Sequence, residues 1–581
     1  MLRGLFRTKN LDEILAPLSD EKRSLKRSLG AFEVTMIGIG AIIGAGIFAT
    51  IGTAAAGDAF RPGAGPSLML SFAITALVCA FTALCYAEMA AMVPISGSAY
   101  TYSYATMGEL VAWIIGWDLI LEYAIGNVAV AISWANYFRT FVHDALGIDI
   151  PQWLSTDFRT ARKIPGLIES APHLFGVPVV FNLLALGIVA LITMVLVWGI
   201  KESSQFNAVM VGVKILVLLF FITIAVYFVS PSGMAANWRP FQPTGWGGTL
   251  AGAAVVFFAY IGFDAVSTVA EETRNPARDL PIGIIASLII CTILYVVVAA
   301  VFTGLIPYHE LARRLATEQA EPLTMALNHV APNARWASAI VAFGSVIAHT
   351  AVLLVFQLGQ PRIFFSIARD GLLPPVFAKV HPRFKTPHVT TILTGVLVGG
   401  FAAVMSIDEM VDLTNIGTLF AFVLVCVGIT ILRAKDPFRP RPFRVPFGPW
   451  LLPMMGAASC LFLMYYLPPT SWWRFVAWLM LGLSVYLSYG YARSELGRRC
   501  GRPARTPAWL SLMAFGSFLT AIGLLTIPHT ASLGELAAAL TTGVAEGGRR
   551  TVIGLGLIGA GLLSGLFGWI LSRGGRAAAA A

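Results

Sequence analysis

The stretch IGIGAIIGAGIF, Ile37 to Phe48, lies inside the first long apolar run of this sequence and contains four glycines. A run of this kind has to be helical to cross a bilayer, because lipid offers no partners for backbone N–H and C=O groups. Glycine weakens a helix interior by about 1 kcal/mol relative to alanine. The glycines therefore have two explanations. Either they let neighbouring helices pack closely, or the helix is interrupted near Gly44-Ala45-Gly46 and its free backbone groups bind a ligand.

The composition is that of a membrane protein. Of the 581 residues, 57% are hydrophobic and only 12% are charged, whereas soluble domains carry about 45–50% apolar and about 25% charged residues. We therefore expect a polytopic protein embedded in a lipid bilayer. Basic loops at the membrane surface explain the net charge of +10, so nucleic acid is not an expected partner.

Several functional classes lack the residues that they need. The six cysteines form no CxxC pair and accompany no histidine cluster, so neither a disulfide framework nor a metal site is expected. The sequence has no GKS/T phosphate loop, HExxH or GxSxG motif, which argues against ATP-driven pumping and hydrolase chemistry. We therefore expect no cofactor and no enzymatic activity. Residues 1–30 are charged and have no apolar core, so we expect no cleavable signal peptide there.

Fourteen apolar runs are long enough, at about 20 residues, to cross the roughly 30 Å core of a bilayer. They lie at 34–56, 67–92, 110–140, 179–200, 206–229, 249–269, 282–306, 337–366, 388–406, 411–432, 450–468, 473–492, 508–527 and 552–572. With the N-terminus in the cytoplasm, most of the 40 Lys and Arg residues fall in inside segments, as the positive-inside rule requires. We therefore predict cytoplasmic termini and an integral protein of the cell membrane.

A second apolar run is also interrupted. The stretch FFAYIGFDAVSTVAEETRNPARDLP, Phe257 to Pro281, places Gly262 and then Asp264 where hydrocarbon is expected. The two interrupted runs are the first and the sixth, which are matching members of two five-helix halves, and this match indicates an inverted-repeat transporter. Helix N-termini at the breaks favour a carboxylate, and free carbonyl groups favour an ammonium group. The expected ligand is therefore a zwitterionic amino acid.

The order of the runs predicts five parts. Residues 1–32 form a cytoplasmic arm, and 33–230 form a first repeat of helices 1–5 with an outside loop at 139–178. Residues 231–435 form a second repeat of helices 6–10, 436–573 carry accessory helices 11–14, and 574–581 form a C-terminal tail. The outside loop contains four prolines and is expected to be a partly ordered cap.

Four separated motifs resemble a known family. They are SLKRSLGAFEVTMIGIGAIIGAGIF (Ser24 to Phe48), YAEMAAMVPISGSAYTYSY (Tyr86 to Tyr104), the stretch from Phe257 to Pro281, and GQPRIFFSIARDGLLPP (Gly359 to Pro375). In this order they resemble the cationic amino acid transporter branch of the amino acid–polyamine–organocation (APC) superfamily, over about residues 25–495. The resemblance implies an all-α, 5+5 inverted-repeat (LeuT-like or APC) fold with helices 1 and 6 broken, and secondary transport of amino acids.

The same resemblance implies a substrate site. The backbone of the cargo would meet Ile42, Ile43, Gly44, Ala45 and Gly46 on helix 1, and Phe258, Ala259 and Ile261 on helix 6. Relatives often carry threonine where this chain has Ala45. A hydroxyl group is therefore missing here, and binding of the cargo carboxylate depends more on backbone N–H groups.

Lys214 lies in the middle of a span, in the stretch NAVMVGVKILVLLFF. A lysine there costs about 2.5–3.5 kcal/mol on insertion scales, which a purely structural role has to explain. Its ammonium group can replace a bound sodium ion by bridging carbonyl groups of helices 1 and 8, and burial makes the amine a candidate proton carrier. The family resemblance places its helix 5 lysine in this role.

Several further polar residues lie in apolar runs. Asp118 and Glu122 are four residues apart and share one helical face. Glu122 resembles the helix 3 acid of the family's substrate cavity, where it contacts a cationic side chain, tunes the proton site, or forms only a helix–helix hydrogen bond. Asp264 matches the helix 6 acid and is a candidate for proton coupling, as is Glu122. We expect Glu88 at the cytoplasmic gate, and His349 as a packed polar residue rather than a proton relay.

The leading hypothesis is a proton-coupled symporter that takes up amino acids by alternating access, with the proton gradient as its energy source. Cationic and small neutral L-amino acids are both candidate substrates, and the oligomeric state stays open. An amino acid exchanger or uniporter on the same scaffold is a close alternative. A sensor that binds amino acids without moving them is less favoured, because it would need neither Lys214 nor an acidic cavity.

Overall fold

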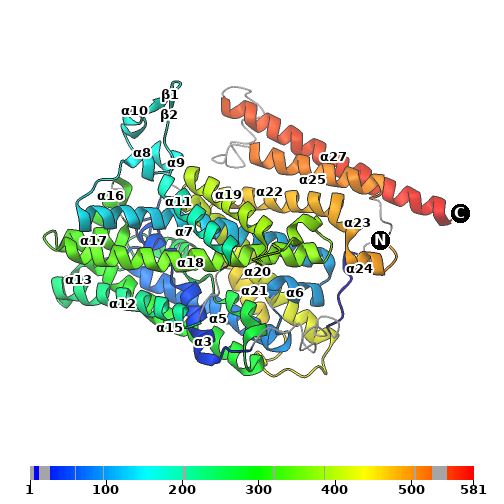
Figure 1. Ribbon diagram of the computed structural model, residues 1–581, viewed down its shortest axis with the longest axis horizontal. Coiled ribbons are helices and arrows are strands. Elements are labelled where there is room, and N and C mark those ends of the chain that lie inside the picture. The colour runs from blue at the N-terminus through cyan, green and yellow to red at the C-terminus, as the bar shows by residue number, and fades with distance from the viewer. Residues whose placement is uncertain are drawn as a thin grey trace.

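The computed structural model describes residues 5–11, 27–58, 61–95, 97–199, 204–317, 321–384, 386–502, 506–526 and 546–580. These residues are largely helical and include one short hairpin of strands β1 (His173–Leu174) and β2 (Val177–Pro178). The long helices lie side by side in Figure 1 and share a large apolar core. Most of the predicted N-terminal arm lies outside the described residues.

Ten helical segments of the described chain are long and apolar enough to cross a membrane, and a bent pair makes an eleventh. The ten are α5 (Leu68–Met92), α7 (Glu109–Leu146), α12 (Ser204–Phe228), α14 (Gly245–Val256) with η4 (Phe257–Tyr260) and η5 (Asp264–Glu272), α15 (Pro276–Leu305), α18 (Arg335–Arg369), α20 (Ile407–Lys435), α22 (Pro469–Val485) with η7 (Tyr486–Gly490) and α23 (Tyr491–Arg493), α25 (Ala508–Thr526) and α27 (Glu546–Ala580). The bent pair consists of α3 (Ala31–Ile42) and a second half made of η2 (Gly46–Thr50) and α4 (Ile51–Ala56).

Three further apolar helices are shorter: α11 (Leu183–Trp198), α19 (His388–Val404) and α21 (Leu451–Tyr465), with 16, 17 and 15 residues. Each of the fourteen predicted runs overlaps one of these helices. The chain is therefore an all-helical, polytopic integral membrane protein with a broken first helix. The count of fourteen spans stays a prediction, because three of the helices fall short of the about 20 residues that cross the hydrocarbon core.

The centre of the molecule is an antiparallel pair, α7 and α18. Ser133 and His349 are joined by a hydrogen bond of 2.7 Å, and the Ser338 hydroxyl donates to the Asp144 carboxylate. Each helix advances eleven residues between these two contacts, which is about 16 Å along the axis. The pair therefore stays in register over about half of the roughly 30 Å hydrocarbon core of a membrane.

The helix α7 is longer than the sequence predicted. Its buried positions continue through Tyr137 to Val142, and the helix ends only at Leu146. Gly147 then takes a left-handed conformation with φ +66°, and its N–H group donates to the His143 carbonyl, as helix C-terminal glycines commonly do. The remainder of the predicted outside loop contains α8 (Gln152–Ser155), α9 (Phe158–Ala161), α10 (Leu167–Ser170) and the β-hairpin, around a small apolar cluster.

The two ends of the molecule differ. The helices α13 (Pro231–Asn237), α16 (Tyr308–Thr317) and α17 (Pro322–Val330) lie at one end, which we call the cap end because α7 also leads there into α8–α10 (Figure 1). The opposite, arm end carries residues 5–11, α6 (Ser98–Thr106), η6 (Pro375–Ala378) and α24 (Glu495–Arg499). There the Lys9 N–H donates to the Tyr104 carbonyl at 3.1 Å and the Glu109 N–H donates to the Arg7 carbonyl at 3.0 Å.

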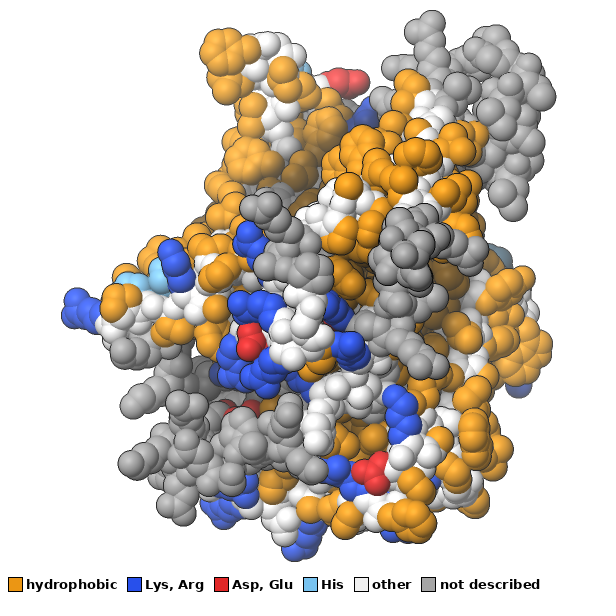
Figure 2. Space-filling view, turned by 90° about the vertical axis from the view of Figure 1, so that its right-hand side faces the viewer, with side chains coloured by type: hydrophobic (Ala, Val, Ile, Leu, Met, Phe, Trp, Pro, Cys, Tyr) orange, Lys and Arg blue, Asp and Glu red, His pale blue; other side chains and the backbone are white. Residues whose placement is uncertain are grey.

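Lys and Arg side chains gather on the arm end, as Figure 2 shows. Basic residues favour the cytoplasmic side of a membrane. The expectation that the arm end is cytoplasmic therefore stays, as a prediction.

The last two described helices, α25 and α27, pack against each other at the side of the bundle, and α25 also packs against α22 (Figure 1). The first two pack through glycines: a Cβ on Gly516 would lie 2.5 Å from the Gly561 carbonyl oxygen, and a Cβ on Gly523 would lie 2.6 Å from that of Gly554. Glycines at such positions let two membrane helices approach closely.

Candidate substrate site

The first helix is interrupted where its glycines are densest. The helix α3 ends at Ile42, Ile43 is extended with ψ 102°, and the second half begins with the π-helical turn η2 at Gly46. The two halves are bent by 41°. Close packing and an interruption are both present, at different positions, and ligand binding by the backbone groups at the break stays a prediction. A Cβ on Gly38 would lie 2.5 Å from the Ser287 hydroxyl, so this glycine serves close packing, whereas Gly44 and Gly46 lie at the break.

The sixth run is interrupted as well. Regular α-helix ends at Val256, a 3-10 turn follows to Tyr260, and a second 3-10 segment starts at Asp264. Gly262, between the two 3-10 segments, has φ +121°, and a Cβ there would lie 2.7 Å from the Ala41 carbonyl oxygen, so only glycine fits.

The structure brings the two interruptions into direct contact. A Cβ on Gly46 would lie only 2.2 Å from the Cα of Ala259. The predicted substrate residues of both segments are buried, and these are Ile42, Ile43, Gly44, Ala45, Gly46, Phe258, Ala259 and Ile261. The residues of the implied site are therefore not accessible to solvent.

Polar side chains from neighbouring helices donate hydrogen bonds to the carbonyl groups at each break. The Lys214 ammonium group donates to the carbonyls of Gly40 at 2.6 Å and Ile43 at 3.0 Å, and the Tyr295 hydroxyl donates to that of Ile42 at 3.0 Å. The Asn415 amide on α20 donates to the carbonyls of two residues at the end of α14, Ala254 at 2.8 Å and Val255 at 3.2 Å. Polar side chains thus hold carbonyl groups at both broken ends.

The expected bridge from Lys214 to helix 8 is only half present. Both hydrogen bonds of the ammonium group go to the first helix, and the described residues of α18 accept none from it. The carbonyl groups of Ile42 and Ile43 each already accept a hydrogen bond, from Tyr295 and from Lys214, so they are not unpartnered groups reserved for a cargo ammonium group.

The buried acids divide into two places. Asp264 accepts a hydrogen bond of 3.2 Å from the Gly262 N–H and so stabilises the second interruption. Asp118 lies against α20, where a Cβ on Gly417 would be 2.8 Å from its carboxylate oxygen. Both carboxylate oxygens of Asp118 and one of Glu122 have no hydrogen-bond partner among the described residues. No hydrogen bond of the described residues joins Glu122 to either interruption.

His349 is a buried, hydrogen-bonded residue. Its ring contacts Ser133 at 2.7 Å and the Ser345 carbonyl at 2.6 Å, and it packs on the rings of Phe48 and Tyr137. These contacts fit the interpretation as a packed polar residue.

Two buried ion pairs lie toward opposite ends of the bundle. At the arm end, Glu88 pairs with Arg433 and accepts from the Val445 N–H at 2.7 Å. At the cap end, Arg61 pairs with Asp412 through bonds of 2.7 and 3.1 Å. Sequence reasoning selected Glu88 but missed the Arg61–Asp412 pair, Tyr295 and Asn415, although a polar residue within an apolar run was a usable signal for Asn415.

Comparison with known proteins identifies the family. Residues 29–490 match the model of the amino acid permease family. The chain is 46% identical to the branched-chain amino acid permease BcaP of Bacillus subtilis, over 86% of this chain and 100% of the relative. It is 42% identical to a methylthioribose transporter of the same organism over the same shares, and 37% identical to the vacuolar cationic amino acid transporter 4 of Arabidopsis thaliana over 75% of this chain and 68% of the relative.

The chain belongs to the amino acid permease family, which is a family of transporters and not of enzymes. The resemblance drawn from the four motifs is thereby confirmed. The described residues contain no group of His, Cys, Asp and Glu side chains that could hold a metal ion.

Proposed function

We propose that this protein is a secondary active transporter that takes up amino acids across the cell membrane by alternating access. The observation that carries the proposal is the direct contact of two interrupted helices in a buried position, because interrupted helices at matching places form the substrate sites of inverted-repeat transporters. The cargo backbone would bind at Ile42–Gly46 and at Phe258, Ala259 and Ile261.

The two broken ends are supported in the same way, which favours two inverted repeats at 33–230 and 231–435. Lys214 is on the fifth predicted helix and holds carbonyls of the first, and Asn415 is on the tenth and holds carbonyls of the sixth. In a 5+5 repeat, helices 5 and 10 occupy equivalent places. We accordingly place the cap end outside the cell and the arm end in the cytoplasm, in line with the distribution of basic residues.

A neutral, apolar amino acid fits the surroundings best. The nearest atom to a Cβ on Gly44 is a methyl group of Val352 at 2.9 Å, and Phe258 and Ile261 contribute further apolar surface. The relative named a branched-chain amino acid permease supports this choice. Cationic amino acids are the second candidate, because Asp118 and Glu122 keep unpartnered carboxylate oxygens in the interior.

Counterflow in proteoliposomes tests transport directly. Vesicles preloaded with unlabelled L-leucine should accumulate labelled L-leucine, whereas a sensor would bind it without accumulation. Competition by unlabelled isoleucine, valine, arginine and lysine then separates the two substrate classes. Failure of the whole panel to support counterflow would refute the proposal.

Proton coupling is tested at Lys214. In the proposed mechanism, loss of the Lys214 proton releases the carbonyls of Gly40 and Ile43, which loosens the first interruption and lets cargo leave inward. Arginine stays protonated at all physiological pH values. The variant Lys214→Arg should therefore bind L-leucine but fail to concentrate it under an inward proton gradient, and Lys214→Ala should also lose gradient-driven uptake.

Lys435→Arg is the matched control, because Lys435 also donates to a backbone carbonyl, that of Thr106 at 2.9 Å, but at the arm end. It should accumulate leucine as the parent does. Accumulation by Lys214→Arg at the parental level, or full replacement of protons by sodium, would show that coupling does not use this lysine.

A further inference from the structure

The β1–β2 hairpin exposes an apolar tip. The turn residue Phe175 is 98% exposed, and its neighbours Leu174 and Val177 are 61% and 65% exposed. A Cβ on Gly176 would meet no atom of the described residues within 4 Å, so the turn extends away from its surroundings. Phenylalanine is usually buried in proteins, and clustered exposed apolar side chains mark contacts with a protein or a membrane.

The geometry of the turn does not explain a phenylalanine. Leu174 pairs with Val177, which leaves a two-residue turn of Phe175 and Gly176. Both turn residues have positive φ, +52° and +79°, as in a type I′ turn, where asparagine is a favoured first residue. A left-handed backbone is unfavourable for a bulky side chain. A large apolar side chain is therefore held at the tip against the local preference of the backbone.

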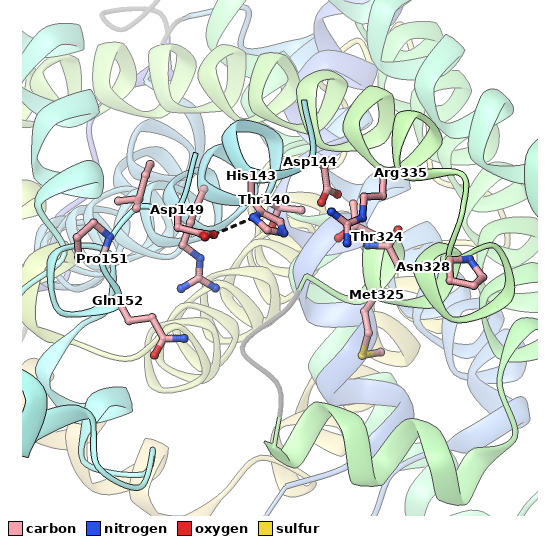
Figure 3. Close-up of a pocket in the computed structure, with 13 residues that line it drawn as sticks. Thr140, His143, Asp144, Asp149, Pro151, Gln152, Thr324, Met325, Asn328 and Arg335 are labelled. Atoms are coloured by element: carbon pink, nitrogen blue, oxygen red, sulfur yellow. Dashed lines mark hydrogen bonds and ion pairs between the residues drawn. The ribbon is translucent and has the colours of Figure 1, made fainter. Parts of the chain in front are cut away.

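The hairpin belongs to a cap, residues 148–182 between α7 and α11, that is fixed to the bundle. The apolar cluster inside this cap contains none of the three apolar tip residues, so the tip does not serve the core of the cap. At the start of the cap, the His143 ring on α7 contacts the Asp149 carboxylate at 2.8 Å (Figure 3). At its end, the Asn182 N–H donates to the Ala403 carbonyl of α19 at 3.0 Å. The hairpin thus rises from a fixed base.

The hairpin also lies beside the lipid-facing surface. Only four residues separate β2 from α11, a helix that exposes apolar side chains such as Leu191 and Met194. From Ser170 to Trp198 the sequence contains no Asp, Glu, Lys or Arg, so the tip, the linker and the helix form one uncharged segment. In Figure 1 the hairpin projects sideways from the bundle, across the direction of α7 and α18. A projection of this kind at the end of a lipid-facing helix reaches the interfacial layer, which is about 5–8 Å thick on each side of the hydrocarbon core.

We propose that the tip of the β1–β2 hairpin inserts into the lipid interface at the cap end, with Phe175 as its deepest side chain. Its partner is the boundary between head groups and acyl chains of phospholipids, which accepts apolar side chains. The hairpin contains no Lys or Arg, so the insertion does not depend on anionic head groups. The insertion anchors the cap, and with it the ends of α7 and α11, to the bilayer. The inference does not depend on the proposed transport function.

Fluorescence quenching by lipids tests the insertion on the full chain. An environment-sensitive fluorophore is attached at Val177→Cys, in a protein that also carries Cys500→Ser, because Cys500 is exposed and the other five cysteines are buried. The protein is reconstituted in phosphatidylcholine nanodiscs with a nitroxide on the acyl chains, either near the glycerol or near the bilayer centre. The shallow nitroxide should quench the fluorophore strongly, and the deep nitroxide should quench it weakly.

Phe175→Asn separates insertion from folding. Asparagine fits the left-handed backbone, so in detergent this variant should unfold at the temperature of the parent or above it, but the fluorophore should lose its quenching by lipid. Gln152→Cys on α8 is the matched control site, because Gln152 lies in the same cap and lines a cavity of about 680 Å³ together with Asp149 (Figure 3). A fluorophore there should stay unquenched by either nitroxide.

Three results would overturn the inference. The first is an unquenched fluorophore at position 177, or equal quenching in Phe175→Asn and the parent. The second is quenching that occurs only when the nanodiscs contain anionic phosphatidylglycerol, because apolar insertion needs no negative head group. The third is a fluorophore that is shielded from water but not quenched by lipid, which would show that a protein surface covers the tip.

Discussion

Replacing Gly46 with alanine is the sharpest structural test of the substrate site. The added Cβ would lie 2.2 Å from the Ala259 Cα, and ordinary contacts begin at 3.4 Å, so the two segments must separate by at least about 1.2 Å. Because the obstructing atom belongs to the backbone, no side-chain rotation can relieve the overlap. Forcing one methyl group into a close-packed interior costs about 1–3 kcal/mol.

If this strain falls on the cargo-bound state, leucine uptake at low concentration should fall by about 5-fold to 150-fold, at tenfold for each 1.4 kcal/mol. The measurement is initial uptake into proteoliposomes, with thermal unfolding recorded on the same preparation. Gly400→Ala on α19 is the control, since no atom lies within 4 Å of its Cβ position, and it should match the parent. A folded Gly46→Ala protein that transports as fast as the control would refute the contact between the two interruptions.

Two further predictions concern the buried ion pairs at the two ends of the bundle. Arg61→Met should lower the free energy of unfolding by roughly 3–5 kcal/mol, because it leaves the buried Asp412 carboxylate without its main partner. The double variant Arg61→Met with Asp412→Leu should recover most of the lost stability. Equal thermal stability of Arg61→Met and the parent would contradict this prediction. Glu88→Gln should weaken the bond to Arg433 and speed leucine efflux from preloaded vesicles relative to uptake, and an unchanged ratio of the two rates would exclude a gating role for Glu88.

The sequence predicted what depends on local chemistry. Glycines at 44 and 46 pointed to the break of the first helix, which the structure confirms, because the cost of glycine in a helix is a local property. The glycine before Asp264 led to the second irregular segment for the same reason, since a left-handed backbone requires this residue.

The sequence could not predict contacts between distant residues. Arg61 and Asp412 are 351 positions apart, and Tyr295 reaches a carbonyl group 253 positions away. Charge and polarity in an apolar run indicate that a partner is needed, but the helix packing selects which one. The same limit explains the bridge expected from Lys214 to helix 8, which the packing replaced with two bonds to one helix.

The helix α20 carries one member of each of the two buried ion pairs. Asp412 near its start pairs with Arg61, and Arg433 near its end pairs with Glu88, so the pairs are 21 residues, or about 31 Å, apart along one rigid element. Between them, Asn415 on the same helix holds the carbonyls before the second interruption. In the proposed alternating-access cycle, each pair closes the site at its own end, so that the site opens to one side when the pair at that end separates, and breaking a buried pair is costly. Opening both ends together would break two such pairs at once, whereas opening one end keeps the other pair. Under this proposal, access to one side at a time is the less costly motion, as alternating access requires.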